Sequence, residues 1–242
     1  MSNPVLNINN DQIERTVNAN EIMTINGTLS ITAFMGLILV MSAWFVWSRL
    51  ALGYTDLGTM LMSAGGIVGF IVGMIIIFTR NTFLVPVYAV CEGFLLGGIS
   101  ATFEQAYPGI VTQAVAGTFA AFFSMLILYK SGIIKCSDKF RSVLFISTLS
   151  VAVVYLVNFI GSFFGYNIPL INTASNFGII FSLIVILIAS FNLIIDFDFV
   201  ERGVAQMFPK KYEWYAAFGL MVTLIWIYLE VLKLLAKLND RK

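Results

Sequence analysis

Residues 177–195 read FGIIFSLIVILIASFNLII and contain no charged side chain. About 20 such residues cross the hydrocarbon core of a bilayer as an α-helix. Six more apolar runs of similar length occur along the chain, near 25–47, 59–79, 83–101, 110–129, 143–164 and 213–236. The pattern predicts an all-α membrane protein built as a bundle of seven transmembrane helices.

The composition points to the same class of protein. Hydrophobic residues make up 59% of the 242 residues and charged residues only 11%, whereas a soluble domain carries about 25% charged residues. The 14 basic and 13 acidic residues nearly cancel, so nucleic acid is not an expected partner. The expected partner is the lipid bilayer, and the composition does not indicate an oligomeric state.

The chain divides into three parts by polarity. Residues 1–23 are polar and rich in asparagine, and we interpret them as an N-terminal tail. They lack a basic start followed by a short apolar core, so we expect no signal peptide. The transmembrane domain covers residues 24–238, and residues 239–242 form a short C-terminal tail.

Basic residues in the short loops predict the orientation, because cytoplasmic loops carry an excess of Lys and Arg. Nine basic residues fall on one side of the predicted bundle: Arg15, Arg80, Lys130, Lys135, Lys139, Arg141, Arg202, Lys210 and Lys211. The opposite loops hold only Arg49, which predicts a cytoplasmic N-terminus. Lys233, Lys237, Arg241 and Lys242 at the end of the chain run against this prediction. Seven crossings are favoured, and the alternative is a re-entrant last segment with six.

Several kinds of chemistry are excluded or disfavoured by the residues that are missing. The chain has no histidine, which rules out Ser-His-Asp triads, HExxH zinc sites and haem held by imidazole. Cys91 and Cys136 lack the spacing of metal ligands and predict no disulfide. The GxGD signature of aspartyl intramembrane proteases is absent, and Lys233 lies too close to the helix end for a retinal lysine. We therefore expect neither an enzyme nor a resident cofactor.

Glycines recur every fourth residue in two of the predicted helices. Gly65, Gly69 and Gly73 share one face of the second helix, and Gly93 and Gly97 share one face of the third. Small residues at this spacing let helix backbones approach closely in a membrane. Tight packing is the simplest interpretation, and sliding during gating is the alternative.

Four acidic residues fall inside or at the ends of predicted membrane helices: Glu92, Asp196, Asp198 and Glu230. A charged side chain at mid-bilayer costs about 2.5–3.5 kcal/mol on insertion scales, so such residues usually have a function or a partner. Arg80 ends the second helix on the side of Asp196 and could neutralise it. Carboxylate oxygens suit Ca²⁺, and neighbouring carboxylates share protons. The acids therefore predict a pathway for a cation or for protons.

Each of these acids also has a simpler explanation. Asp196 and Asp198 are also compatible with solvated acids at a helix end. Glu230 is also compatible with a local ion pair, because Lys233 follows it at the i+3 position. Glu92 is also compatible with a protonated side chain hydrogen-bonded to a neighbouring helix.

Short motifs along the whole chain resemble one known family. They are SNPVL at 2–6, EGFLLGGIS at 92–100, YPGIV at 107–111, ERGV at 201–204, EWYAAFGL at 213–220 and YLE at 228–230. These motifs are similar to those of the Bax inhibitor-1 superfamily, in its YccA-like branch. The resemblance implies six helices around a central seventh helix, in the inner membrane of a bacterial cell.

The resemblance also implies two functions. Some members of the superfamily are pH-sensitive calcium leaks, in which an acidic pair in the last two helices binds the ion and an arginine latches the closed state. By position, the pair is Asp196 and Glu230 and the latch is Arg80. The YccA-like branch further implies a regulator of a membrane-bound, ATP-dependent protease that acts through the N-terminal tail.

The chain departs from the calcium-leak pattern in two respects. The acid in the seventh helix is glutamate rather than aspartate, and the segment between the two acids is longer. The two acids can meet only if the sixth helix continues through Val200, Val204 and Met207, whose spacing suits a helix.

Overall fold

The computed structural model describes residues 22–166, 168, 171 and 173–241. Within them, the long helices are α2 (Ile25–Ala51), α3 (Thr55–Thr79), α4 (Val85–Ala106), α5 (Ile110–Lys130), α6 (Asp138–Phe163), α8 (Asn176–Ala205) and α9 (Lys211–Asn239). A short 3-10 helix, η3 (Thr82–Leu84), leads into α4. All seven long helices are long and apolar enough to cross a membrane. The prediction of seven membrane helices is confirmed.

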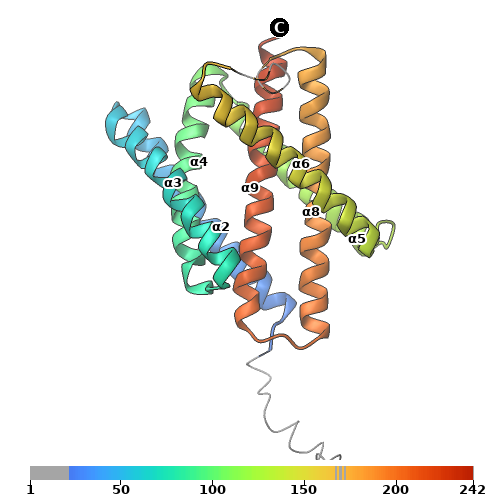
Figure 1. Cartoon of the computed structure of the whole chain (residues 1–242). Helices are drawn as coiled ribbons and strands as arrows, with labels where there is room; N and C mark the ends of the chain where they lie inside the picture. Colours follow the sequence, from blue (N-terminus) through green and yellow to red (C-terminus); the bar gives the residue numbers. More distant parts are fainter. Residues whose placement is uncertain (1–21, 167, 169–170, 172, 242) are drawn as a thin grey trace, which may run out of the picture.

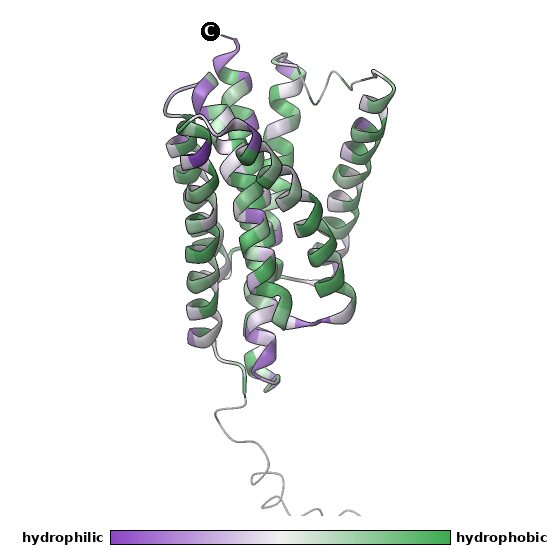
Figure 2. Ribbon diagram, turned by 90° about the vertical axis from the view of Figure 1, so that its left-hand side faces the viewer, coloured by the Kyte–Doolittle hydropathy of each residue, from purple (hydrophilic) through white to green (hydrophobic). Residues whose placement is uncertain are grey.

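Consecutive helices run in alternate directions, and the described start of the chain lies at the opposite end of the bundle from the C-terminus (Figure 1). Apolar residues cover most of the helix lengths, and many hydrophilic residues lie near the helix ends (Figure 2). The last segment is one continuous helix of 29 residues, about 43 Å long at 1.5 Å per residue. A single helix of this length is long enough for a full crossing, as the seven-helix prediction requires.

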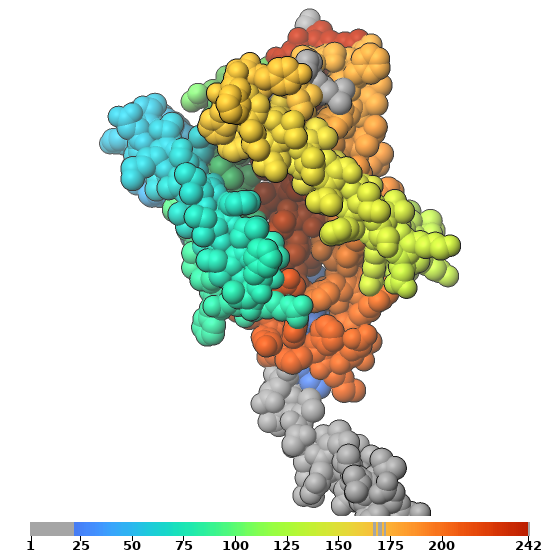
Figure 3. Space-filling view, in the orientation of Figure 1, coloured from blue at the N-terminus to red at the C-terminus, as the bar shows by residue number. Residues whose placement is uncertain are grey.

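Helix α9 lies at the centre of the bundle (Figure 1). It packs against α2, α4, α5 and α8, and its residues contribute to both of the larger apolar clusters. Helix α6 is different, because it crosses the bundle obliquely and packs mainly against α8. In the space-filling view a hollow between α3 and α6 leaves part of α9 uncovered (Figure 3).

The regularly spaced glycines lie where helices approach most closely. A Cβ atom on Gly65 would lie 2.5 Å from the carbonyl oxygen of Cys91 in α4. A Cβ atom on Gly93 would lie 2.5 Å from the carbonyl oxygen of Leu39 in α2. Helix α4 is therefore held between α3 and α2 by glycine contacts on two of its sides.

Side-chain caps explain why several helices begin where they do. Thr24, Ser137 and Ser175 each accept a hydrogen bond from a backbone N–H in the first turn of α2, α6 and α8. Such caps satisfy amide groups that have no partner within the helix. Helix α3 ends at Arg80, whose φ of 53° lies in the left-handed region.

Candidate functional site: carboxylates within the membrane helices

Asp196 lies inside the membrane-spanning part of α8, about 13 Å before the end of the helix. Thr223 of α9 donates its hydroxyl hydrogen to Oδ2 of Asp196 at 2.7 Å. The other oxygen, Oδ1, lies 3.4 Å from the place where a Cβ on Gly219 would be, so that glycine makes room for the carboxylate. No basic side chain among the described residues forms an ion pair with Asp196.

Glu230 is almost fully buried on α9, with an exposed fraction of 1%. Tyr155 of α6 donates a hydrogen bond to its Oε2 at 2.9 Å. Nζ of Lys233 lies 3.2 Å from Oε1 and 4.6 Å from the centre of the Tyr155 ring. Glu230 therefore has the local lysine partner that its spacing in the sequence suggests.

The structure does not bring Asp196 and Glu230 together. Helix α8 continues through Val200 and Val204, as a meeting of the two acids requires, and it ends at Ala205. Asp196 nevertheless lies beside Thr223, which is seven residues and about 10 Å along α9 from Glu230. Each carboxylate has its own partners, so their role as joint cation ligands stays a prediction.

Asp198 forms an ion-paired cluster at the basic end of the bundle. Its Oδ2 contacts Nη2 of Arg141 in α6 and Nε of Arg202 one turn further along α8, the latter at 2.9 Å. Asp198 is buried, with an exposed fraction of 8%, and so it is not a solvated acid at a helix end. The cluster attaches the start of α6 to α8.

Arg80 is exposed at the C-terminal end of α3. It forms no ion pair with any acid of the described chain. The contact with Asp196 that the sequence suggested is absent from this structure.

Glu92 is buried in α4 and its carboxylate lies against α3. It shares a side-chain hydrogen bond with Tyr88, one turn earlier in the same helix. Its Oε1 lies 3.1 Å from the place of a Cβ on Gly69 in α3. The Tyr88 ring meets the edge of Phe218 on α9, with ring centres 4.9 Å apart. The hydrogen-bond partner of Glu92 is therefore Tyr88 in its own helix, and the Tyr88 ring separates Glu92 from the central helix α9.

Glu213 is a further buried acid that was not among the predicted site residues, with an exposed fraction of 1%. It accepts hydrogen bonds from the backbone N–H and the hydroxyl of Thr24, at 2.9 and 3.0 Å. Met23 also donates its N–H to the carbonyl oxygen of Phe208 at 2.8 Å. These bonds attach the start of α2 to the start of α9. The sequence offered one signal, an acid in the first turn of an otherwise apolar helix.

Lys237 was counted only as one of the basic residues near the C-terminus. It is buried, and its Nζ donates to the carbonyl oxygen of Gly178 at 3.1 Å and to the hydroxyl of Ser182 at 2.9 Å. Lys233 is paired with Glu230. These partners explain how two lysines can lie at the end of the bundle away from the basic loops.

The acids of the spans therefore fall into two groups by their partners. Asp198 and Glu230 have basic partners, whereas Asp196 and Glu92 have only hydroxyl partners among the described residues. The described chain holds no group of three or more His, Cys, Asp or Glu side chains that could bind a metal ion.

The seven long helices, with α9 at their centre and acidic side chains inside several of them, define a polytopic membrane protein. The family model described as Bax inhibitor 1 like matches residues 3–240. The chain belongs to that family. Comparisons with curated proteins and with solved structures gave no match.

Proposed function

We propose that this protein is a passive conduit for Ca²⁺ or protons in the inner membrane of a bacterial cell, with its N-terminus in the cytoplasm. Protonation of membrane carboxylates controls the flux, and no catalytic step is involved. Bound Ca²⁺ is the cargo in this proposal and not a structural cofactor.

The main support is that two acids of the spans, Asp196 and Glu92, have no basic partner among the described residues. An ionised carboxylate inside a membrane span is costly unless it binds a proton or a cation. Among the described residues, the hydrogen-bond partner of Asp196 is the hydroxyl of Thr223 and no basic side chain pairs with it, so it is the acid best suited to exchange a proton for a cation. Glu230 is paired with Lys233, so we assign it a smaller part than Asp196 in binding the cation.

The places where the two acids or their partners contact α9 support an ion route beside this helix. Asp196 lies near Gly219 and Thr223, and the Tyr88–Glu92 pair reaches α9 at Phe218. Asp196 from α8 and Tyr88, the partner of Glu92 in α4, thus contact the same stretch of the central helix. Arg80, the proposed latch, forms no ion pair with an acid of the described residues, so the proposal rests on the carboxylates.

The test is calcium influx into liposomes that contain the purified protein and a calcium dye, measured from about pH 8 to about pH 6. We expect influx to fall as the pH falls, because protonation removes the charge that attracts the cation. Asp196→Asn resembles the protonated acid, and we expect low influx at every pH. Asp56→Asn, at an exposed position in the first turn of α3, is the matched control and should behave as the wild type does.

Two results would contradict the proposal. If wild-type liposomes show no influx at any pH, the buried acids have a structural role. If Asp196→Asn keeps the pH dependence of the wild type, the switch lies on another group.

A second candidate function is regulation of a membrane-bound, ATP-dependent protease through the N-terminal tail, as in the YccA-like branch. Residues 1–21 lie outside the described part of the chain. The hydrogen bonds of Met23 and Thr24 place the exit of the tail beside the loop between α8 and α9, at the end that holds Lys210 and Lys211. This position is close to the basic side of the bundle, where a cytoplasmic partner would be met.

Deletion of residues 2–20 separates the two functions. We expect the truncated protein to lose its association with the protease and to keep its ion flux, because every buried acid remains. Continued co-purification and regulation of the protease would show that the tail is not the contact.

A further inference from the structure

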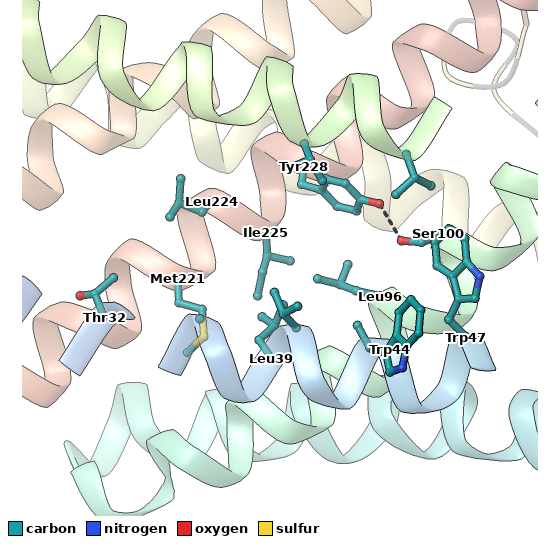
Figure 4. A pocket seen from close by; sticks show the side chains of 15 residues that line it. Thr32, Leu39, Trp44, Trp47, Leu96, Ser100, Met221, Leu224, Ile225 and Tyr228 are labelled. Atoms are coloured by element: carbon teal, nitrogen blue, oxygen red, sulfur yellow. Dashed lines mark hydrogen bonds between the residues drawn. The ribbon is translucent and has the colours of Figure 1, made fainter. Parts of the chain in front are cut away.

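A cavity of ≈ 340 Å³ lies between α2, α4, α5 and α9. None of its 15 lining residues is charged, and nearly all are apolar (Figure 4). Its side toward the bilayer is open at Val40 and Trp44, which are 61% and 71% exposed. A space of this size, with apolar walls and few polar groups, has the character of a ligand site.

The polar feature at one end of this cavity is a pair of hydroxyl groups. The hydroxyl oxygens of Ser100 in α4 and Tyr228 in α9 lie 2.6 Å apart, and both side chains are buried. Each hydroxyl carries one hydrogen, and their mutual hydrogen bond uses only one of the two. Neither group has another hydrogen-bond partner in the described chain. One buried O–H therefore remains free to donate to a molecule in the cavity.

The free donor and the apolar wall together restrict the ligand. A buried water molecule usually makes about three hydrogen bonds, and the side chains at this end of the cavity offer only the hydroxyl pair and the indole N–H of Trp47. A long apolar chain that carries one acceptor oxygen near its polar end satisfies both features. The acyl chain of an ester-linked glycerolipid has this chemistry.

The depth of Ser100 and Tyr228 in the membrane indicates which end of the lipid chain lies at the hydroxyl pair. Ser100 is about 9 Å before the end of α4 at Ala106, in the part of the hydrocarbon core that adjoins the head-group boundary on that side. Trp47 lies at the same end of the cavity (Figure 4), and tryptophan is enriched at that boundary. The lining residues of α2 run from Thr32 to Trp47, about 22 Å, which is long enough for a chain that fills one leaflet.

We propose that this groove binds one acyl chain of an ester-linked glycerolipid from the leaflet at the C-terminal ends of α2 and α4. The ester carbonyl accepts the free hydrogen of the Ser100–Tyr228 pair. The chain extends along α2 past Val40 toward Gly36.

The first test fills the groove. A Cβ on Gly36 would meet no atom within 4 Å, so Gly36→Phe combined with Val40→Phe adds two rings to the cavity without a clash at the glycine. Ile67→Phe combined with Ile71→Phe is the matched control, because both isoleucines are exposed on α3 at the same spacing of four. The readout is native mass spectrometry of each protein after mixing with diacyl phosphatidylethanolamine in detergent.

We expect the wild type and the control to retain one lipid and the filled variant to retain at least tenfold less. Equal retention by the filled variant and the control, or no retention by the wild type, would overturn the proposal. A second filling variant, Val115→Phe on the α5 wall, gives the same test if the first variant does not fold.

The second test examines the ester contact. The wild type should retain the diacyl lipid about fivefold better than its dialkyl ether counterpart, which is the worth of one neutral hydrogen bond. The double variant Ser100→Ala with Tyr228→Phe should lose this preference while still binding both lipids. Equal binding of ester and ether lipids by the wild type would refute the contact with the carbonyl.

Discussion

Gly97 and Gly36 form a matched pair of positions for testing how closely the helices pack. Gly97 is in α4 and Gly36 is in α2, and each lies in the interior of its helix. Alanine stabilises a helix interior by roughly 0.5–1 kcal/mol relative to glycine, and this gain applies to both positions. The two positions differ in their surroundings.

A Cβ atom at Gly97 would collide with the backbone of α2. It would lie 2.8 Å from Cα and 2.9 Å from the carbonyl carbon of Ala43, whereas carbon atoms pack at about 3.5–4.0 Å. Backbone atoms cannot rotate away as a side chain can, so α2 and α4 would have to separate. A Cβ at Gly36 would meet no atom within 4 Å.

Overpacking of this kind costs about 1–3 kcal/mol. Because the gain in helix propensity is common to both variants, the free energies of unfolding of Gly97→Ala and Gly36→Ala should differ by about that amount. Gly36→Ala should be slightly more stable than the wild type, and Gly97→Ala should be less stable.

The measurement is reversible unfolding of each purified variant in mixed micelles, followed by tryptophan fluorescence, with the wild type beside them. If Gly97→Ala unfolds at the same denaturant concentration as Gly36→Ala, or at a higher one, the close approach of α2 and α4 is refuted.

Two further predictions concern buried acids, with Asp56→Ala as the exposed control for both. Asp198→Ala removes the ion pair to Arg141 and should lower the free energy of unfolding by about 1–2 kcal/mol. This is less than the roughly 3–5 kcal/mol lost when a fully buried pair is broken, because the arginine is partly exposed. An unchanged thermal midpoint would contradict the attachment of α6 to α8. Glu213→Ala leaves the N–H of Thr24 without its acceptor and should cost about 1–3 kcal/mol. The same change should speed proteolysis at the start of α2, and cleavage at the control rate would count against the attachment to α9.

The existence of seven membrane helices could be predicted from sequence because length and apolarity are local properties. The ends of the helices were harder to predict. The apolar run in α8 stops at Ile195, yet the helix continues to Ala205. Phe197, Val200 and Gly203 are buried after the first aspartate, so packing against neighbouring helices carries the helix beyond the point where hydropathy ends.

The partners of the charged residues were only partly predictable. Glu230 and Lys233 lie one turn apart, and their pairing follows from helix geometry alone. Asp198 and Arg141 are 57 residues apart, and Glu213 and Thr24 are 189 residues apart. No local pattern relates residues at such separations, because the contact depends on which helices become neighbours.

By itself, the sequence determined that the chain is a membrane protein with seven helices and acids inside them, because each of these features depends on residue type and spacing along one helix. Tertiary structure decided which acids have basic partners, where Asp196 lies on α9, and that Ser100 and Tyr228 meet in an apolar groove. These features depend on the relative positions of different helices, which the close glycine contacts and the central place of α9 establish.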